Sequence, residues 1–311
     1  MMNKYKNILE IKDLYDNGTN ILRHLKSKNG SETNSTDDIL ISYDLQSGTY
    51  LKGLSKDIEF RNRYCKSLAR KISDLGQFDS ILEVGTGEGI TLGKLIQNFE
   101  KRPKKIYALD ISLSRLIFAQ HYFSDISLDN ISLFTADLFN IPLPDNSIDI
   151  VFTSHAIEPN GGNEKAALTE LYRIAKKFVV LLEPSYENAS IEGQERMDRH
   201  GYIKNLPGYA KELNQKVIYN ELFEVNYNPL NPSGLTIIEK NTDDVNQADF
   251  ICPNTGQILI NYNENLLYSP KGYLAYSVIK SIPCLLKENA ILSYHLMTDF
   301  QKFKKDNNLK Y

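Results

Sequence analysis

Apolar positions between Phe78 and Leu182 alternate between short runs typical of buried strands and longer stretches with helical spacing. The expected strands are Ser80–Val84, Lys105–Leu109, Ile131–Phe134, Ile148–Thr153 and Phe178–Leu182, and the expected helices are Thr91–Phe99, Leu113–Phe123 and Glu164–Lys177. Strands that alternate with helices at this spacing predict an α/β fold, a Rossmann-like doubly wound sheet that is mostly parallel. Ligands bind such sheets at the carboxyl ends of the strands.

The segments on either side of this core break its rhythm. Helical spacing near the N-terminus, interrupted by a polar loop from Ser27 to Asp38, predicts a helical layer or lid beside the first strand. The polar stretch 185–215 predicts an insertion over a cleft, and Val217–Phe223 with Gly234–Glu239 predict an antiparallel edge of the sheet.

After residue 240 the pattern becomes that of a small β-rich unit that ends in a helical tail with several lysines. The predicted organisation is therefore an N-terminal helical or lid segment (1–75), the main α/β domain (76–240) and a small C-terminal unit (241–311).

Composition narrows the class of protein. With 41% apolar and 24% charged residues the chain is typical of globular proteins, and its net charge of −3 does not favour nucleic acid as a partner. Cys65, Cys252 and Cys284 are too few and too widely spaced for a disulfide framework. No signal peptide and no run of about 18 apolar residues is evident, so we expect a cytoplasmic protein with no membrane segment.

Three glycines at alternate positions follow the first expected strand, in Glu83-Val84-Gly85-Thr86-Gly87-Glu88-Gly89. The third glycine comes too early for the dinucleotide fingerprint, and no G-K-[ST] of a phosphate-binding loop is present. The carboxylate of Glu83 would repel a pyrophosphate and suits a ligand with an ammonium group. Asp110 and Asp137 follow the next two strands, where they could meet a ribose and an adenine.

These motifs resemble those of class I S-adenosylmethionine-dependent methyltransferases. Their E/D-x-G-x-G-x-G turn is matched at Glu83, their ribose acid at Asp110, and their adenine-side motif at Ala136-Asp137-Leu138, while Leu143–Val151 resembles their approach to strand four. Tyr43–Tyr50 is similar to a segment that closes over the cofactor. The resemblance implies S-adenosylmethionine as cofactor, and the predicted cofactor-binding residues are Glu83, Gly85, Thr86, Gly87, Gly89, Asp110, Ile111, Asp137, Leu138, Thr153, Tyr43 and Tyr50.

Candidates for chemistry and acceptor binding follow strands four and five. His155, just past a strand end, is the candidate general base, and packing beside the cofactor is its alternative role. The predicted substrate-binding residues are Glu158, Asn160, Glu183, Arg196, Arg199 and His200. The two arginines could clamp a carboxylate or phosphate, although a solvated helical face also explains such a charged run.

The C-terminal unit resembles a degenerate zinc-ribbon methyltransferase-activator domain, through Cys252-Pro253-Asn254-Thr255 and Leu267–Gly272. Three of the four ligand positions hold Thr255, Ser269 and Gly272, and one cysteine cannot bind tetrahedral zinc. We therefore predict no metal, and a remnant that buttresses the main domain or mediates a homodimer.

The favoured interpretation is a methyltransferase that acts on an oxygen or nitrogen of a small molecule. Thr153-Ser154-His155-Ala156 stands where enzymes that methylate exocyclic base nitrogens carry N-P-P-Y, and nucleic acid is an unfavoured partner. Two alternatives stay open: an RNA or protein methyltransferase, suggested by the ribbon-like unit, and a non-catalytic module that binds S-adenosylmethionine.

Overall fold

A seven-stranded sheet forms the centre of the molecule. The structure, a computed structural model, describes residues 7–310. The strands are β1 (Ser80–Val84), β2 (Lys105–Asp110), β3 (Ile131–Thr135), β4 (Ile148–Ser154), β5 (Ala175–Pro184), β6 (Lys216–Leu222) and β7 (Ser233–Glu239). Their order is β3-β2-β1-β4-β5-β7-β6, with β7 antiparallel to both of its neighbours. The predicted α/β fold with a mostly parallel sheet is confirmed.

Helices cover both faces of this sheet because the strand residues alternate between two cores. Ile81 of β1 points to one core with α5 (Ile58–Ser73), α6 (Ile90–Asn98) and α7 (Leu113–Asp125). Its neighbour Leu82 points to the other core with α8 (Glu164–Ile174) and α10 (Leu206–Glu212). The carboxyl ends of β1 and β2 lead through short turns into α6 and α7.

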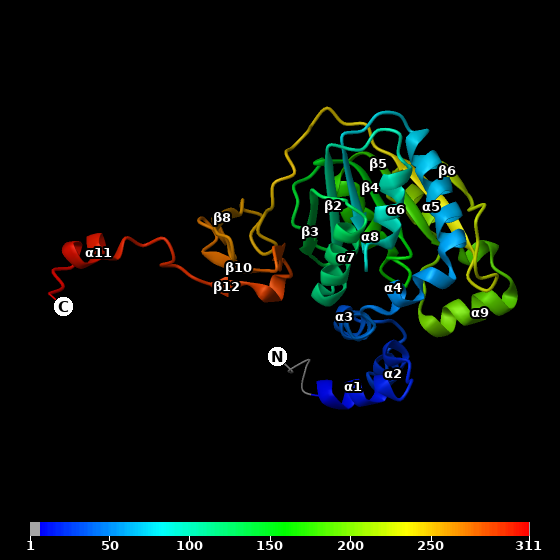
Figure 1. Cartoon of the computed structure of the whole chain (residues 1–311), viewed down its shortest axis with the longest axis horizontal. Helices are drawn as coiled ribbons and strands as arrows, with labels where there is room; N and C mark the ends of the chain where they lie inside the picture. Colours follow the sequence, from blue (N-terminus) through cyan, green and yellow to red (C-terminus); the bar gives the residue numbers. More distant parts are fainter. Residues whose placement is uncertain (1–6, 311) are drawn as a thin grey trace.

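The N-terminal layer consists of α1 (Ile8–Asp16), α2 (Ile21–Lys28), α3 (Thr36–Leu45), α4 (Thr49–Gly53) and the short 3-10 helix η1 (Leu54–Lys56). Figure 1 shows α1, α2 and α3 below the main sheet. The predicted loop from Ser27 to Asp38 is too long, since α3 already begins at Thr36. The start of α3 is set by a capping box in which the Asp38 N–H donates to Ser35 Oγ at 3.1 Å.

The predicted helix Glu164–Lys177 also differs from the structure, because α8 ends at Ile174 and β5 begins at Ala175. Lys176 and Lys177 place their ammonium groups 3.4 and 3.5 Å from Asp149 Oδ1. Tertiary contacts with β4 thus overrule a local sequence with good helix formers.

The insertion after β5 contains η2 (Tyr186–Asn188), α9 (Ile191–His200) and α10. Ser190 caps α9 by accepting from the Gly193 N–H at 3.1 Å, and Gly201 ends it with φ +69°. The Gly161 N–H donates to Gly201 O at 3.1 Å, so the end of α9 is fixed against the loop that follows β4.

The C-terminal unit holds a second sheet with β8 (Ile260–Asn263), β9 (Leu266–Ser269), β10 (Leu274–Ile279), β11 (Ile282–Pro283) and β12 (Ile291–Leu292), followed by α11 (Phe300–Asp306). A 3-10 helix, η3 (Lys287–Asn289), precedes β12. The unit covers the edge of the main sheet, where the Leu285 N–H donates to Thr135 O at 3.1 Å. Figure 1 shows α11 at the end of a tail that projects away from both sheets.

The two turns that resemble a zinc ribbon have the same backbone pattern. N–H groups of Thr255 and Gly256 donate to Cys252 O, and those of Gly272 and Tyr273 donate to Ser269 O. The turns meet, because a Cβ on Gly272 would lie 2.7 Å from Thr255 Oγ1 and 2.8 Å from Ser269 Oγ.

These side chains do not fit zinc, since Cys252 is the one soft donor among them and lies buried with its Sγ 3.3 Å from the Tyr276 hydroxyl. Within residues 7–310 no group of three or more histidine, cysteine, aspartate or glutamate side chains is arranged to hold a metal ion. The metal-free remnant stays a prediction.

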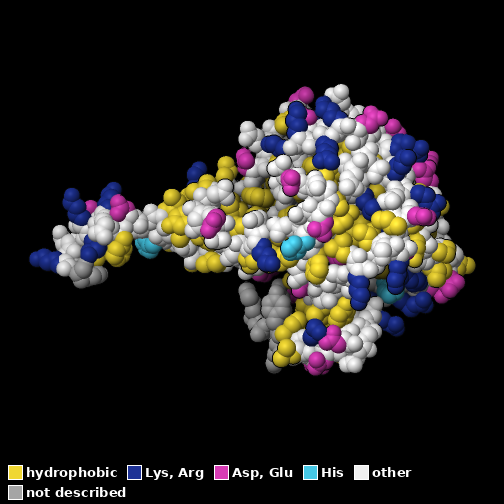
Figure 2. Space-filling view, in the orientation of Figure 1, with side chains coloured by type: hydrophobic (Ala, Val, Ile, Leu, Met, Phe, Trp, Pro, Cys, Tyr) yellow, Lys and Arg dark blue, Asp and Glu magenta, His cyan; other side chains and the backbone are white. Residues whose placement is uncertain are grey.

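Apolar side chains lie exposed on the C-terminal unit. They include Ile260, Tyr262, Tyr273, Ile291 and Leu292. Figure 2 shows hydrophobic side chains gathered on this part of the molecule, left of the main body. None of the helices in the described part of the chain is long and apolar enough to cross a membrane.

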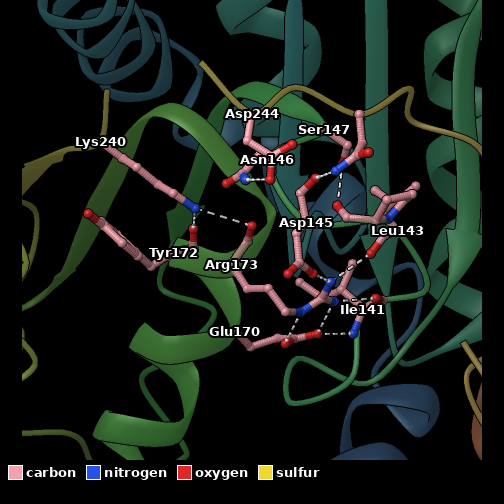
Figure 3. Close-up of polar contacts among 12 residues, drawn as sticks. Ile141, Leu143, Asp145, Asn146, Ser147, Glu170, Tyr172, Arg173, Lys240 and Asp244 are labelled. Carbon is pink, nitrogen blue, oxygen red and sulfur yellow. Dashed lines mark hydrogen bonds and ion pairs between the residues drawn. The ribbon is translucent and has the colours of Figure 1, made fainter. Parts of the chain in front are cut away.

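A network around Arg173 of α8 fixes the loop between β3 and β4 (Figure 3). Its guanidinium donates to the carbonyls of Leu143 and Ile141, both at 2.9 Å. It also forms ion pairs with Asp145 at 2.7 Å and Glu170 at 2.8 Å. One partly buried side chain thereby satisfies backbone and carboxylate acceptors that no helix or strand pairs.

We expect Arg173→Met to lower the free energy of unfolding by about 2 kcal/mol, because it removes the charge partner of Glu170 and one donor from each of two carbonyls. Urea unfolding followed by circular dichroism would measure this. The matched control is Arg102→Met at an exposed position with no ion pair among the described residues. An Arg173 variant as stable as the control would contradict the structural role.

Candidate functional site

The glycine turn after β1 adopts a backbone that side chains rarely allow. Gly85, Gly87 and Gly89 have φ values of +74°, +56° and +76°. N–H groups of Gly85 and Thr86 both donate to Leu109 O of β2 at 2.9 Å, which fixes the turn between the two strands. Gly89 is the N-cap of α6, so the helix begins directly at the turn.

Glu83 lies under this turn with 1% of its surface exposed. The Thr86 hydroxyl donates to Glu83 Oε2 at 2.5 Å. Burial raises the pKa of Glu83 to about 8, against the opposing effect of that hydrogen bond. The carboxylate has no cationic partner among the described residues, so an ammonium group of a ligand would stabilise its charged form.

The carboxylate of Asp110 organises the turn from the end of β2. Its Oδ2 accepts from the Gly87 N–H at 2.8 Å, and its Oδ1 accepts from the Ser112 N–H at 2.9 Å. Each oxygen keeps a second lone pair, so the group can also accept hydroxyl hydrogens from a ligand.

A smaller cavity of about 90 Å³ lies beside Asp110, at the ends of β1 to β4. Ile111, Asp137 and Leu138 line it together with Asp110, as do apolar side chains such as Val84 and Leu109. Oδ1 of Asp137 accepts from the Phe139 N–H at 2.9 Å, and burial raises the pKa of Asp137. With Tyr43 and Gly85, the structure brings six predicted cofactor residues around one largely apolar space.

A larger cavity of about 540 Å³ opens on the other side of the turn. Its walls include the predicted site residues Glu83, Gly85, Thr86, Gly87, Tyr43, Tyr50, His155, Glu158, Arg196, Arg199 and His200. Helices α2, α3 and α9 contribute side chains to it, so the N-terminal layer and the insertion enclose the same space. Burial and the neighbouring Arg196 lower the pKa of His200, which makes this histidine neutral at pH 7.

Two acids tie the Tyr43–Tyr50 segment to the site. Glu88 of the glycine turn accepts backbone N–H groups of Gly48, Tyr50 and Leu51 at 2.7 to 3.3 Å. Asp44 accepts the Ser112 hydroxyl at 2.6 Å and the Ser114 hydroxyl at 3.0 Å, at the start of α7. The segment is thus held over the glycine turn.

Arg115 of α7 lies between the two tyrosines. The centre of its guanidinium is 5.2 Å from the Tyr43 ring and 4.7 Å from the Tyr50 ring. Only 8% of the residue is exposed, yet its Nε has no hydrogen-bond partner among the described residues. A buried guanidinium without an anion partner is costly, which favours a ligand acceptor at this place.

His155 follows β4 in a left-handed conformation with φ +55°. Its Nδ1 lies 2.6 Å from Glu158 Oε2, and its Nε2 lies 2.9 Å from Ser233 Oγ. Burial lowers the pKa of His155, but the hydrogen bond and charge of Glu158 outweigh burial and raise it overall. Glu158 thus favours the cationic form of the imidazole, and both ring nitrogens are engaged.

We expect His155→Gln to lower the free energy of unfolding by about 1 kcal/mol near pH 6 and by little near pH 9. The raised pKa of His155 stabilises the fold below its ordinary value of 6.5, and this contribution is lost as pH rises through the raised value. The lowered pKa of Glu158 keeps the pair ionised down to acid pH. Thermal unfolding of the variant at pH 6 and pH 9 would test this prediction, with the exposed His121→Gln as control. An equal loss of stability at the two pH values would contradict the ion pair.

Eight predicted residues do not line the larger cavity: Gly89, Asp110, Ile111, Asp137, Leu138, Thr153, Asn160 and Glu183. Glu183 is buried at the end of β5 and accepts N–H groups of Ala156, Ile157 and Glu158, at 3.0, 3.2 and 3.1 Å. It fixes the loop that carries His155 and does not face the cavity. Thr153 is fully buried in β4 beside Glu183. Asn160 lines the smaller cavity, and its amide donates to Ile157 O at 3.3 Å.

The sequence analysis did not single out several residues that the structure places at the site. They are Arg23, Lys26, Asp44, Arg61, Glu88 and Arg115. Glu88 could have been recognised from the sequence as an acid inside a glycine turn. Arg115 could have been recognised from its place five residues after Asp110, near the start of α7. Arg23 and Lys26 carried none, because their place depends on how α2 folds back onto α9.

The geometry can be compared with known proteins. Residues 81–177 match the family model of a methyltransferase domain. Residues 81–177 form a methyltransferase domain. The match agrees with the methyltransferase resemblance of the glycine turn, which implied S-adenosylmethionine as the cofactor. The match covers the glycine turn, Asp110, Asp137 and His155.

Two curated relatives extend the comparison. The chain is 44% identical over 84 residues to malonyl-[acyl-carrier protein] O-methyltransferase of Marinomonas sp., covering 27% of this chain and 30% of that protein. It is 24% identical over 151 residues to demethylmenaquinone methyltransferase of Corynebacterium urealyticum, covering 49% of this chain and 60% of the relative. The chain thus spans less than two thirds of either relative.

Solved structures similar to this chain include a putative sarcosine dimethylglycine methyltransferase from Galdieria sulphuraria, at 17% identity and a TM-score of 0.48, covering 58% of this chain and 86% of that one. A putative S-adenosyl-L-methionine-dependent methyltransferase from Methanococcus maripaludis is 19% identical with a TM-score of 0.46, covering 63% and 93%.

Proposed function

We propose that the whole protein is an S-adenosylmethionine-dependent methyltransferase that acts on an oxygen or nitrogen of a small-molecule acceptor. The observation that carries the proposal is that two cavities meet at the glycine turn: Gly85 lines both the smaller and the larger cavity, together with Tyr43, Arg115 and His155. A donor bound across the turn would present its methyl group to the larger space.

The residues at the turn fit the parts of the cofactor. Glu83, which lacks a cationic partner in the described chain, would bind the ammonium group, and Asp110 would bind the ribose hydroxyls. Asp137 and the apolar lining of the smaller cavity suit adenine. The unpartnered Nε of Arg115 suits an anionic or stacked group of the ligand.

When bound, the cofactor supplies a methyl group on a sulfonium, whose carbon–sulfur electron pair stays on sulfur as the acceptor lone pair forms the new bond. The task of the protein is to hold the acceptor in line and to exclude water. Helices α2 and α9 line the cavity. The Asn34 amide, in the loop between α2 and α3, donates to Pro159 O at 2.7 Å in the loop after β4 and to His200 O at 3.2 Å at the end of α9.

His155 is the proposed proton acceptor for a hydroxyl substrate, once it is in its neutral form. Since Glu158 raises the pKa of His155, this role requires the rate of methyl transfer to increase with pH above 6.5. An acceptor that has already lost its proton would need no base, and His155 would then act by its positive charge.

A small acceptor is favoured by the enclosed cavity, and neither relative's name concerns a nucleic acid. The test is calorimetry with S-adenosylmethionine, followed by methyl transfer from the radiolabelled donor to pooled small acids, alcohols and amines. We expect binding and label in a small product. Label in bulk tRNA would favour the RNA alternative, binding without transfer would favour the non-catalytic module, and preference for a nicotinamide dinucleotide would overturn the proposal.

A further inference from the structure

The larger cavity contains far more positive charge than its cofactor requires. Five of the nine arginines in the sequence line it: Arg23, Arg61, Arg115, Arg196 and Arg199. Lys26 is a sixth cation. Among residues 7–310 none of these five guanidinium groups forms an ion pair with a carboxylate, and the buried Nη1 of Arg196 has no hydrogen-bond partner.

The acids of the cavity do not balance these cations. Glu158 is paired with His155, and Glu88 is engaged with three backbone N–H groups. Burial holds the pKa of Glu83 at about 8, so this group is largely neutral without a cationic ligand. Asp57 is the remaining carboxylate in the lining.

The cofactor does not supply the missing negative charge. S-adenosylmethionine carries one carboxylate against an ammonium and a sulfonium, so its binding adds positive charge to the cavity. One carboxylate can occupy one or two guanidinium groups. The others are free to bind an anion that arrives with the acceptor.

The cations come from different parts of the fold. Arg61 belongs to α5, and Arg115 of α7 reaches the glycine turn, where a Cβ on Gly87 would be 2.9 Å from its Nη2. Arg23 and Lys26 come from α2, and Arg196 and Arg199 come from α9, so these four lie on the enclosing helices. The Lys26 ammonium donates to Arg199 O at 3.0 Å, which brings the two helices together.

We propose, resting on the function proposed above, that the acceptor is a small molecule with a carboxylate or phosphate group, and that Arg23, Arg196 and Arg199 bind this group. The anion neutralises the facing charges of α2 and α9 and so draws the two helices together over the acceptor. Planar guanidinium groups suit oxyanions in two-point hydrogen bonding.

The test uses malonate and inorganic phosphate as probes, titrated by calorimetry into the full chain, with and without S-adenosylhomocysteine. We expect one of them to bind, and binding to weaken at least about tenfold in Arg23→Gln/Arg199→Gln. Preference for malonate identifies a carboxylate, and preference for phosphate identifies a phosphate group. Arg63→Gln is the matched control, an exposed arginine of α5 outside the cavity lining, and should leave binding unchanged.

Circular dichroism and S-adenosylhomocysteine binding of each variant verify that the fold and the cofactor site are intact. If the nucleoside binds but neither anion does, or if the double variant and the control behave alike, the anion inference is wrong while the proposed function stands. If neither S-adenosylmethionine nor S-adenosylhomocysteine binds, the proposed function fails as well. Phosphate-competitive binding of tRNA instead of small anions would also overturn the inference.

Discussion

Gly85→Ala is expected to lower the affinity for S-adenosylmethionine at least about 30-fold and the free energy of unfolding by about 3 kcal/mol. A Cβ at this position would lie 2.3 Å from Ala156 Cβ, and the backbone has φ +74°. Two rigid segments would have to separate, the turn after β1 and the loop after β4, and both line the predicted cofactor site. Calorimetry and urea unfolding measure the two effects.

Gly76→Ala is the matched control, because Gly76 also has a positive φ, +101°, but nothing lies within 4 Å of the added Cβ. Gly76→Ala should lower the free energy of unfolding by about 1 kcal/mol through backbone strain alone, and it should leave the affinity for the cofactor unchanged. If Gly85→Ala behaves like this control, the close approach of the turn to Ala156 has no role in binding.

Asp110→Asn is the second large prediction, with affinity for S-adenosylmethionine falling about 100-fold. An amide can accept only through one oxygen, so its NH2 group would face the N–H of Gly87 or Ser112, which Asp110 now binds at 2.8 and 2.9 Å. The ribose hydroxyls would also lose a charged acceptor. We expect a loss of about 2 kcal/mol in stability, measured by urea unfolding beside calorimetry.

The control for this change is Asp125→Asn at the exposed C-terminal end of α7, the helix that follows β2. It removes the same charge without touching the turn, so it should alter neither affinity nor stability by a measurable amount. Normal affinity in Asp110→Asn would mean that the acid serves the turn alone and that the ribose lies elsewhere.

The order of elements in the main domain could be predicted from local patterns. Buried strands such as Ser80–Val84 have apolar runs bounded by turns, and α8 shows its stripe of Ala167, Leu168 and Leu171. Errors arose at boundaries. The end of α8 depended on Lys176 and Lys177 reaching Asp149, a contact that no local pattern contains.

The roles of single site residues depended more on tertiary contacts. Glu183 was predicted to bind substrate from its place at a strand end, but its carboxylate is turned to three N–H groups of the next loop. His155 was predicted as a base, and its pairing with Glu158, three residues on, favours the protonated imidazole. The role of each residue depends on where its side chain points in the folded protein, and its position along the chain does not determine this.

The sequence by itself determined the glycine turn, the acids at Glu83 and Asp110 and the cofactor they imply, because these residues act through backbone geometry within one strand–turn–helix unit. Only the tertiary structure decided the charge of the larger cavity. Arg23 and Arg199 are far apart in the chain, and the contact between Lys26 and Arg199 O shows how folding of the N-terminal layer onto the insertion brings them together. The electrostatic potential in a cavity is the sum over charges that lie close in space, and the spacing of residues along the chain does not reveal which charges those are.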